Sequence, residues 1–195
     1  QMALQLGIHS FFPRALEADD CIAYLCDKLD GSKMIVSVDK DFQQLISADV
    51  HLYNPIKKYK VTPQTWSEHC DVPIERFLEV KCLTGDKSDN VPGIPKFGPA
   101  KVRKYLAGQV ELTDDEKLLR DRNLDLFRLD KFKTHDAERE YYDTQLEKIV
   151  GYPVSLDYSQ FISLCKEYEF NKILDKREQW YNTFFLKSKL QNLFK

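Results

Sequence analysis

A short apolar run at residues 34–38, Met-Ile-Val-Ser-Val, most constrains how this chain can fold. Its β-branched residues predict a buried strand. Residues 15–29 precede it, with apolar side chains at near-helical spacing and with Gly31 as a stop signal. A helix followed directly by a buried strand favours an α/β sheet of the parallel type.

The remaining elements predict both strands and helices in the first part of the chain and helices in the rest. Two further short strands are expected at 50–53 and 59–61, joined by a turn at Asn54-Pro55. A loop rich in glycine and proline lies between Gly85 and Gly98. Helices are predicted at 40–47, from Pro63 onwards, at 73–83, 99–106, 114–121 and 137–150, and from 158 to the end.

Composition excludes several classes of protein. The net charge is −2, so the chain is not a uniformly basic nucleic-acid binder, although carboxylates at a metal site can cancel a basic patch elsewhere. The 5 cysteines are scattered without a CxxC pair, which argues against a zinc site or a disulfide framework. No apolar run is long enough to cross a bilayer and no signal-peptide pattern is present, so we expect a cytoplasmic protein that does not contact membranes.

Acidic residues gather in three groups, each at the edge of a predicted element. Asp39 and Asp41 directly follow the strand at 34–38, where ligand sites of parallel sheets are found. In an extended segment, their spacing would point both side chains the same way. The first group opens the helix at 15–29 and the third opens the glycine-rich loop; their acids are Glu17, Asp19 and Asp20, and Asp86 and Asp89.

Carboxylates in such groups can hold Mg²⁺ or Mn²⁺, which prefer a few oxygen ligands and several waters. Two such ions about 4 Å apart can activate water and stabilise the leaving oxygen in phosphodiester hydrolysis. For any one group alone, the simpler interpretation is a set of helix-start or solvated loop acids. Three groups together indicate a two-metal phosphoesterase.

The exact residue order around these acids is a more specific signal than the presence of the acids themselves. Glu17-Ala-Asp19-Asp20, then Ser37-Val-Asp39-Lys-Asp41-Phe, then Gly85-Asp86-Lys-Ser-Asp89-Asn closely resemble, in this order, motifs of the bacterial and bacteriophage 5′-nucleases. That family includes flap endonucleases and the 5′-nuclease domain of DNA polymerase I. The likeness covers about residues 6–106, and residues 124–174 are faintly similar in the style of phage members.

The resemblance implies a PIN-like or Rossmann-like parallel sheet with a helical helix–three-turn–helix part. It implies two Mg²⁺ ions, for which Mn²⁺ can substitute, and no catalytic residues in this chain beyond the metal ligands. The implied ligands are Glu17, Asp19, Asp20, Asp39, Asp41, Asp86 and Asp89.

The loop from Gly93 to Lys101 resembles the family's helix–three-turn–helix element, which holds the duplex downstream of the cleavage point. Glycines allow backbone N–H groups to approach phosphates, and lysines suit sequence-independent contacts. In the family this hairpin also holds K⁺, but Lys96 and Phe97 stand where glycine and isoleucine are typical. The plain alternative is a lysine-rich surface helix. The implied DNA-binding residues are Lys87, Gly93, Lys96, Gly98, Lys101, Arg103 and Lys104.

Family members carry a segment before the first acidic motif that supplies two strands with further acids and a helical arch. We therefore expect a sheet that is incomplete on its N-terminal side, in a truncated, split or processed enzyme. The expected parts are the C-terminal portion of the nuclease core at 1–62, the DNA-binding region at 63–112 and a helical region at 113–195 that packs on the core. The isolated chain should then have little nuclease activity.

The expected function is a Mg²⁺-dependent 5′-3′ exonuclease or flap endonuclease in replication or repair. The abundance of phenylalanine, tyrosine and lysine and the short C-terminal part suggest a phage protein, which would then act in the host cytoplasm. Its DNA would be a 5′-flap, nicked or gapped duplex, with an RNA/DNA hybrid left open. Two other classes remain: a DNA-binding module without catalysis, and a subunit of a replication complex. In the second, the aromatic residues 180–185 would dock a partner such as a single-strand-binding protein or polymerase, unless they form a buried helix.

Overall fold

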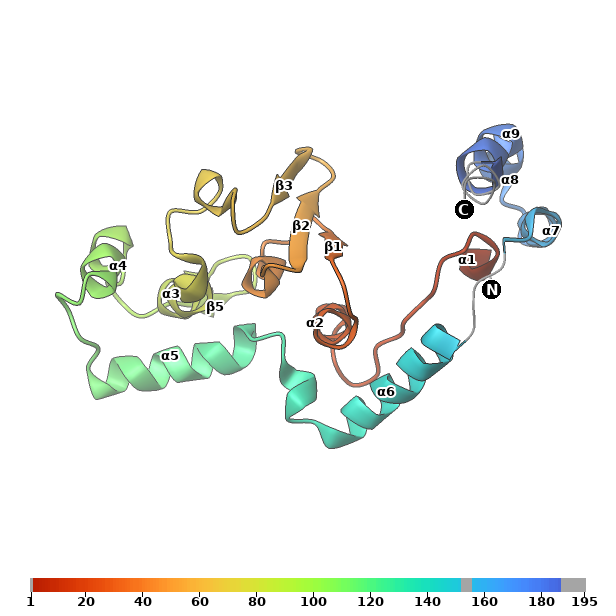
Figure 1. Cartoon of the computed structure of the whole chain (residues 1–195). Helices are drawn as coiled ribbons and strands as arrows, with labels where there is room; N and C mark the ends of the chain where they lie inside the picture. Colours follow the sequence, from red (N-terminus) through yellow and green to blue (C-terminus); the bar gives the residue numbers. More distant parts are fainter. Residues whose placement is uncertain (1, 152–155, 187–195) are drawn as a thin grey trace. The chain divides into compact units, whose positions relative to one another are not determined.

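The predicted strand at 34–38 lies at one edge of a three-stranded sheet. In the computed structural model, which describes residues 2–151 and 156–186, β1 (Lys33–Val36) pairs in parallel with β2 (Val50–Asn54), and Ile35 lies opposite Leu52. β2 then turns back into β3 (Tyr59–Val61), which pairs antiparallel. The sheet order is β1-β2-β3, so the expected strands and the parallel pairing at its start are confirmed (Figure 1).

The chain forms two compact units, which are described separately. One comprises residues 13–138 and contains the sheet; the other comprises residues 1–12 and 139–195. The domain boundaries expected at 62 and 112 stay predictions.

In the larger unit, α2 (Ala18–Lys28) begins with a capping box in which Glu17 and Asp20 satisfy each other's backbone N–H groups. Its buried face includes Tyr24, whose ring meets Phe132 edge-on at 5.4 Å between centroids. α2 also packs against the 3₁₀-helix Asp41–Leu45, which lies in the connection from β1 to β2. This packing places the start of α2 and the end of β1 in the same unit.

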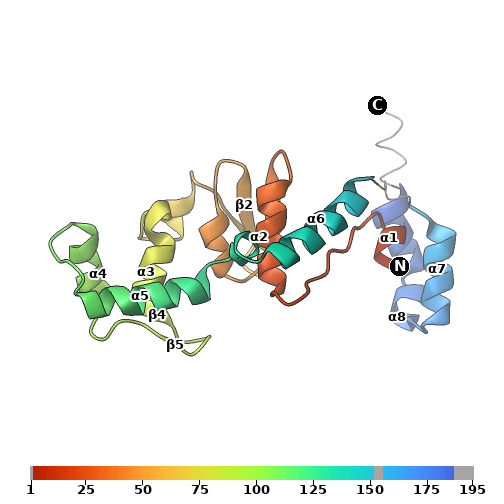
Figure 2. The ribbon, with the colours of Figure 1, turned by 90° about the horizontal axis from the view of Figure 1, so that it is seen from below.

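The helical part of this unit has its own apolar core. α3 (Phe77–Thr84) leads into the short antiparallel pair β4 (Gly85–Asp86) and β5 (Val91–Pro92), followed by α4 (Pro99–Leu106) and α5 (Asp114–Phe127). α5 packs along α3 (Figure 2). The core residues are Val80, Leu83, Ile94, Phe97, Val102 and Leu112.

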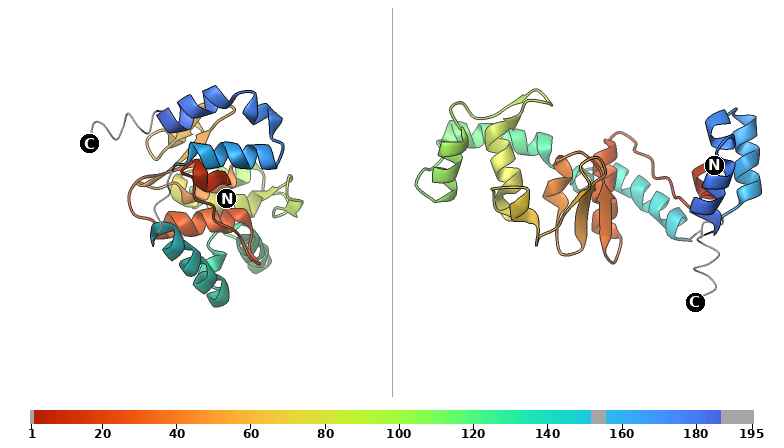
Figure 3. Two further views of the ribbon diagram at one scale, coloured as in Figure 1. Left: turned by 90° about the vertical axis from the view of Figure 1, so that its right-hand side faces the viewer. Right: turned by 90° about the horizontal axis from the view of Figure 1, so that it is seen from above.

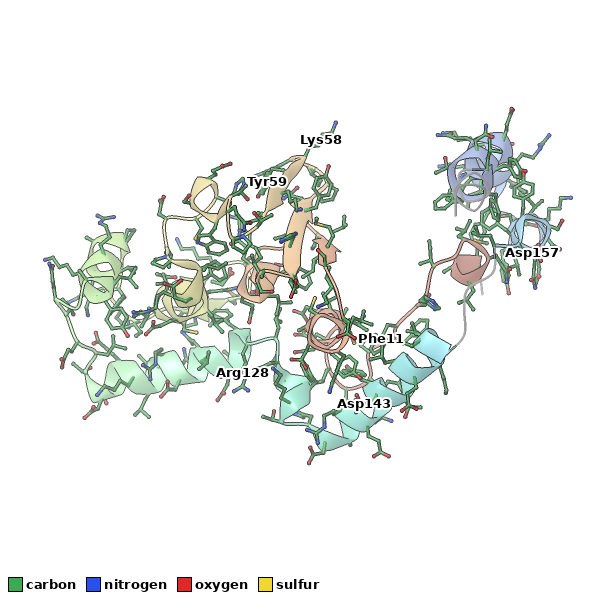
Figure 4. All side chains as sticks on the ribbon, in the orientation of Figure 1. Phe11, Lys58, Tyr59, Arg128, Asp143 and Asp157 are labelled. Carbon is green, nitrogen blue, oxygen red and sulfur yellow. The ribbon has the colours of Figure 1, made fainter. Side chains whose placement is uncertain are left out.

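The short helix expected at 40–47 is present as a 3₁₀-helix at residues 41–45. The helix expected from Pro63 onwards is wrong. Pro63 starts no α-helix: Thr62 and Thr65 bond each other's backbone N–H groups and close a turn, and the 3₁₀-helix Trp66–Glu68 follows. In the β2–β3 hairpin before it, Lys58 ends the turn and Tyr59 begins β3 (Figure 4). The Tyr59 ring stacks on His69 at 4.4 Å between centroids.

The smaller unit is helical. It contains α1 (Met2–Gln5), most of α6 (Asp136–Gly151), α7 (Tyr158–Glu167), α8 (Asn171–Leu174), α9 (Arg177–Trp180) and a π-helical turn at Tyr181–Leu186. Asp157 caps α7 by accepting the Gln160 N–H at 2.9 Å (Figure 4). α1 packs against α7 (Figure 3), and Phe161, Cys165 and Phe185 form the core. The burial of Phe185 supports the buried-helix interpretation of residues 180–185.

No helix within residues 2–151 and 156–186 combines the length and the apolar character needed to cross a membrane.

We predict that Gly93→Ala destabilises the helical part of the larger unit. A Cβ at Gly93 would lie 2.2 Å from the Thr84 carbonyl oxygen at the end of α3. The clash should lower the free energy of unfolding by roughly 2 kcal/mol or more. Gly98→Ala is the matched control, because a Cβ there meets nothing within 4 Å, and it should cost less than about 1 kcal/mol. Urea unfolding measures both, and equal losses would contradict the packing.

Candidate metal centre and DNA-contact loop

The first acidic group lies at the start of α2. Glu17, Asp19 and Asp20 each offer a carboxylate oxygen within 4.8 Å of the others, and no other such group of three or more metal-ligating side chains occurs in the described parts of the chain. Asp20 is fully buried. One of its oxygens accepts the Glu17 N–H at 3.2 Å, while Oδ1 has no hydrogen-bond partner within residues 2–151 and 156–186.

Burial raises the pKa of the Asp20 carboxyl group, and the nearby charges of Asp19 and Glu17 act in the same direction. A buried carboxylate oxygen without a donor is unfavourable, because it has lost its water and gained nothing. A divalent cation would relieve both the burial and the repulsion among the three acids. This donor set therefore fits a hard, oxygen-binding metal ion.

The second group lies just after β1, but not in the expected arrangement. Residues 37–40 bend out of the strand, and Asp39 Oδ1 accepts the backbone N–H of Asp41 at 2.8 Å. Asp41 then begins the 3₁₀-helix. The expectation that both side chains point the same way from an extended segment is therefore wrong, because the turn directs Asp39 at the backbone.

Lys81 joins the second group to the third. This lysine of α3 is 9% exposed, and its Nζ donates to Asp41 Oδ1 and lies 3.1 Å from Asp86 Oδ2. The Phe127 ring of α5 lies beneath it, 4.5 Å from Nζ to the ring centroid. Asp41 and Asp86 come from different motifs, so tertiary folding brings them to one ammonium group.

Burial and the charged neighbours of this cluster shift the pKa values of its members. Burial lowers the pKa of Lys81, but the two carboxylates outweigh it and the net pKa is raised. Burial raises the pKa of Asp41, and the nearby charges of Asp39 and Asp89 add to that effect. Asp86 has a pKa of about 2, chiefly because the Ser88 hydroxyl donates to its carboxylate. Lys81 and Asp86 are therefore charged at neutral pH.

Sequence reasoning missed Lys81. The available signal was a lysine inside the apolar stretch Val80–Leu83, where an unpaired charge would be costly. The third group also differs from the helical turn that its spacing suggests: Asp86 belongs to β4, and Asp89 lies in the turn before β5. Asp89 is exposed.

The glycine-rich loop from α3 to α4 contains the DNA-binding candidates. Gly93 passes close to the backbone at the end of α3, and Gly98 is the N-cap of α4. Lys96 has φ +61°, a left-handed conformation that favours glycine. Lys101 is half-buried; its Nζ donates to Glu116 at 2.6 Å and lies over the Phe97 ring. The other basic candidates, Lys87, Lys96, Arg103 and Lys104, are exposed.

Comparisons with known proteins agree with these observations. The model of the 5′-3′ exonuclease N-terminal resolvase-like domain matches residues 1–71. A 5′-3′ exonuclease from Buchnera aphidicola is 38% identical over 97 residues, which cover 48% of this chain and 34% of that protein. The flap endonuclease Xni of Shewanella loihica is 34% identical over 109 residues, 54% of this chain and 42% of that protein. These matches support the resemblance to the 5′-nucleases that the three acidic motifs carry.

A solved structure extends the likeness at the level of the fold. The bacteriophage T5 flap endonuclease, in complex with DNA and metal ions, superposes with a TM-score of 0.58 at 23% identity, over 72% of this chain and 62% of that one. The PIN-type α/β fold expected from the sequence is confirmed by this match and by the resolvase-like domain model. The sequence matches span less than half the length of the two curated 5′-nucleases.

We predict that Lys81→Met destabilises the larger unit in the absence of divalent metal. Removal of one partner from a buried ion cluster should cost about 3 kcal/mol, because Asp41 and Asp86 are left unpaired. Mg²⁺ should restore part of this loss, since its charge can replace the ammonium group. Thermal unfolding in chelator and in Mg²⁺ measures the effect.

Lys101→Met is the matched control, because Lys101 pairs with Glu116 nearer the surface and should cost less than about 1 kcal/mol. The cluster would be contradicted if Lys81→Met lowers stability no more than Lys101→Met does. It would also be contradicted if the loss of stability in Lys81→Met is the same with and without Mg²⁺.

Proposed function

We propose that this chain forms the metal-binding and DNA-holding part of a Mg²⁺-dependent 5′-nuclease that cuts phosphodiester bonds at 5′ ends and flaps of DNA. The observation that carries the proposal is the joint pairing of Asp41 and Asp86 with Lys81. The match of residues 1–71 to the 5′-3′ exonuclease N-terminal domain and the fold match to a flap endonuclease in complex with DNA and metal ions support it.

Seven acids are proposed to hold two divalent ions: Glu17, Asp19, Asp20, Asp39, Asp41, Asp86 and Asp89. Bound Mg²⁺, or Mn²⁺ in its place, would activate water and stabilise the leaving oxygen. The protein would hold the metal-binding side chains in position. The capping box fixes Glu17 and Asp20 at the start of α2, while Lys81 holds Asp41 and Asp86 in position until metal binds.

The loop from α3 to α4 is proposed to act as the helix–three-turn–helix that grips duplex DNA. Gly93 and Gly98 leave backbone N–H groups accessible, and the start of α4 adds partial positive charge for phosphate. Exposed Lys87, Lys96, Arg103 and Lys104 would contact the backbone without reading sequence, with Lys101 joining them. A K⁺ ion is proposed at the same hairpin, where Lys96 adopts the backbone conformation usual for glycine.

The sheet offers a place for further strands. Among the described residues, no strand pairs with the outer edge of β1, and Met34, Val36 and Val38 beside it are 44%, 63% and 54% exposed. A mainly apolar cavity of about 390 Å³ lies between α2 and β1. Strands of parallel sheets are usually covered on both faces. We propose that an additional segment, in the same or another polypeptide, pairs with β1 and completes the nuclease.

The expected substrates are 5′-flap, nicked and gapped duplexes, with an RNA/DNA hybrid as a further candidate, in the cytoplasm of a bacterium or of a phage-infected host. The main competing function is DNA binding without catalysis, or a place in a replication complex beside a polymerase or single-strand-binding protein. All seven acids argue against pure binding, because negative charge near phosphate weakens it. Mg²⁺- or Mn²⁺-dependent cleavage of a 5′-flap substrate separates the enzyme from both.

We predict that, in an enzyme completed by the segment that pairs with β1, Asp41→Asn and Asp86→Asn each reduce flap cleavage by about 100-fold and change DNA affinity by less than about threefold, because these acids serve the metal site. Cleavage and anisotropy assays on one substrate measure the two quantities. Asp130→Asn is the control, since Asp130 pairs with Arg128 at the surface. Equal losses of cleavage and affinity would assign Asp41 and Asp86 a structural role.

We predict that the isolated chain cleaves a flap substrate in Mg²⁺ weakly or not at all, and that a segment supplying the strands next to β1 restores cleavage in trans. Val36→Lys, at the open edge, should weaken this restoration without unfolding the chain, because Val36 is already 63% exposed. Full activity of the chain without any added segment would refute the prediction.

A further inference from the structure

A groove on the smaller unit combines aromatic and basic side chains, none of which belongs to the candidate nuclease site. It has a volume of about 410 Å³ and is lined by residues from α8 to the π-helical turn. Trp180 and Phe184 supply its aromatic surface, and Gln179 and Thr183 add neutral hydrogen-bonding groups. Lys172 and Lys176 add positive charge. The acids proposed for metal binding all lie in the other unit.

The aromatic surface is a fixed platform. Trp180 and Phe184 are one helical turn apart, and their rings stack at 5.4 Å between centroids with 17° between planes. Trp180 also rests on Phe161, a fully buried ring of the core, at 5.6 Å. Both Trp180 and Phe184 are half-buried, so part of each remains accessible. A flat ligand could therefore bind without ordering loose side chains.

The positive charge of the groove is available. Lys172 and Lys176 are exposed, one helical turn apart, and within the described residues no acid forms an ion pair with either. The nearby acids Asp175 and Glu178 do not line the groove. The groove thus joins flat aromatic rings to unpaired cations.

We propose that this groove binds single-stranded nucleic acid, with a base against the Trp180–Phe184 rings and phosphates beside Lys172 and Lys176. Base stacking on aromatic side chains combined with backbone contacts to lysine is how proteins hold single strands without reading sequence. A duplex is a poor fit, because its bases are already stacked on one another. The proposal rests on the proposed nuclease function for the source of the strand, but the binding does not require cleavage.

The same unit offers a matched comparison. A second groove of about 670 Å³ contains Lys166 and Arg177, so it carries the same number of basic side chains. Its aromatic residue is Tyr158, whose hydroxyl donates to the Arg177 carbonyl at 3.3 Å. No stacked pair of rings lines it. If charge alone determined binding, the two grooves would bind single strands equally well. If base stacking contributes, the groove with Trp180 and Phe184 should bind them more tightly.

The test measures binding of a fluorescent oligothymidylate to the full chain in chelator, by anisotropy and by tryptophan emission. Trp66, the other of the 2 tryptophans, is buried in the larger unit and provides a constant background. We expect quenching of Trp180. Lys172→Glu with Lys176→Glu should weaken binding about tenfold or more, and Phe184→Leu about fivefold.

The control is Lys166→Glu with Arg177→Glu, which makes the same charge change in the second groove and should weaken binding by less than about threefold. All four charge substitutions are at exposed positions, so folding should survive, and circular dichroism checks it. Equal losses in the two grooves, or unchanged affinity after substitution of Lys172 and Lys176, would overturn the proposal. Binding of an acidic aromatic peptide in place of oligothymidylate would overturn it in favour of a protein partner.

Flap cleavage measured separately distinguishes this proposal from the proposed function. Cleavage without oligothymidylate binding in the groove would refute the groove alone. Binding in the groove without metal-dependent cleavage under any complementation would refute the nuclease alone.

Discussion

The ammonium group of Lys81 is the contact on which the candidate centre depends. A buried charge is stable only when it is paired, and here it is paired twice, with Asp41 after β1 and with Asp86 at β4. The cluster therefore links the sheet to the helical part of the same unit. The Phe127 ring of α5 closes the cluster from below.

A second constraint acts through the backbone at the end of α3. Gly85 and Gly93 approach so closely that neither position has room for a side chain. Asn123 of α5 is buried there and donates to the carbonyl oxygens of Cys82 and Pro92. These contacts fix the β4–β5 pair, which carries Asp86 at one end and leads into the basic loop at the other. The candidate metal centre and the candidate DNA-contact loop thus share one closely packed support.

Local pattern was sufficient wherever an element is determined by its own residues. The β-branched run predicts β1, the near-helical spacing of apolar side chains at 15–29 predicts α2, and the helix expected at 99–106 is α4. Pattern failed where hydrogen bonds from nearby side chains compete with helix propensity. Thr62-Pro63 has the form of a helix start, yet Trp66 donates its indole N–H to the Val72 carbonyl at 2.6 Å, and the segment stays a turn with a 3₁₀-helix.

The sequence by itself determined the resemblance to the 5′-nucleases, the order of the three acidic groups and the existence of a glycine-rich loop, because these are properties of short contiguous stretches. Only the tertiary structure decided which acids meet. It turned Asp39 towards the backbone, left one oxygen of Asp20 buried without a donor, and brought Asp41 and Asp86 to Lys81. The physical reason is that burial and pairing of charge depend on neighbours from distant segments, which no local spacing specifies.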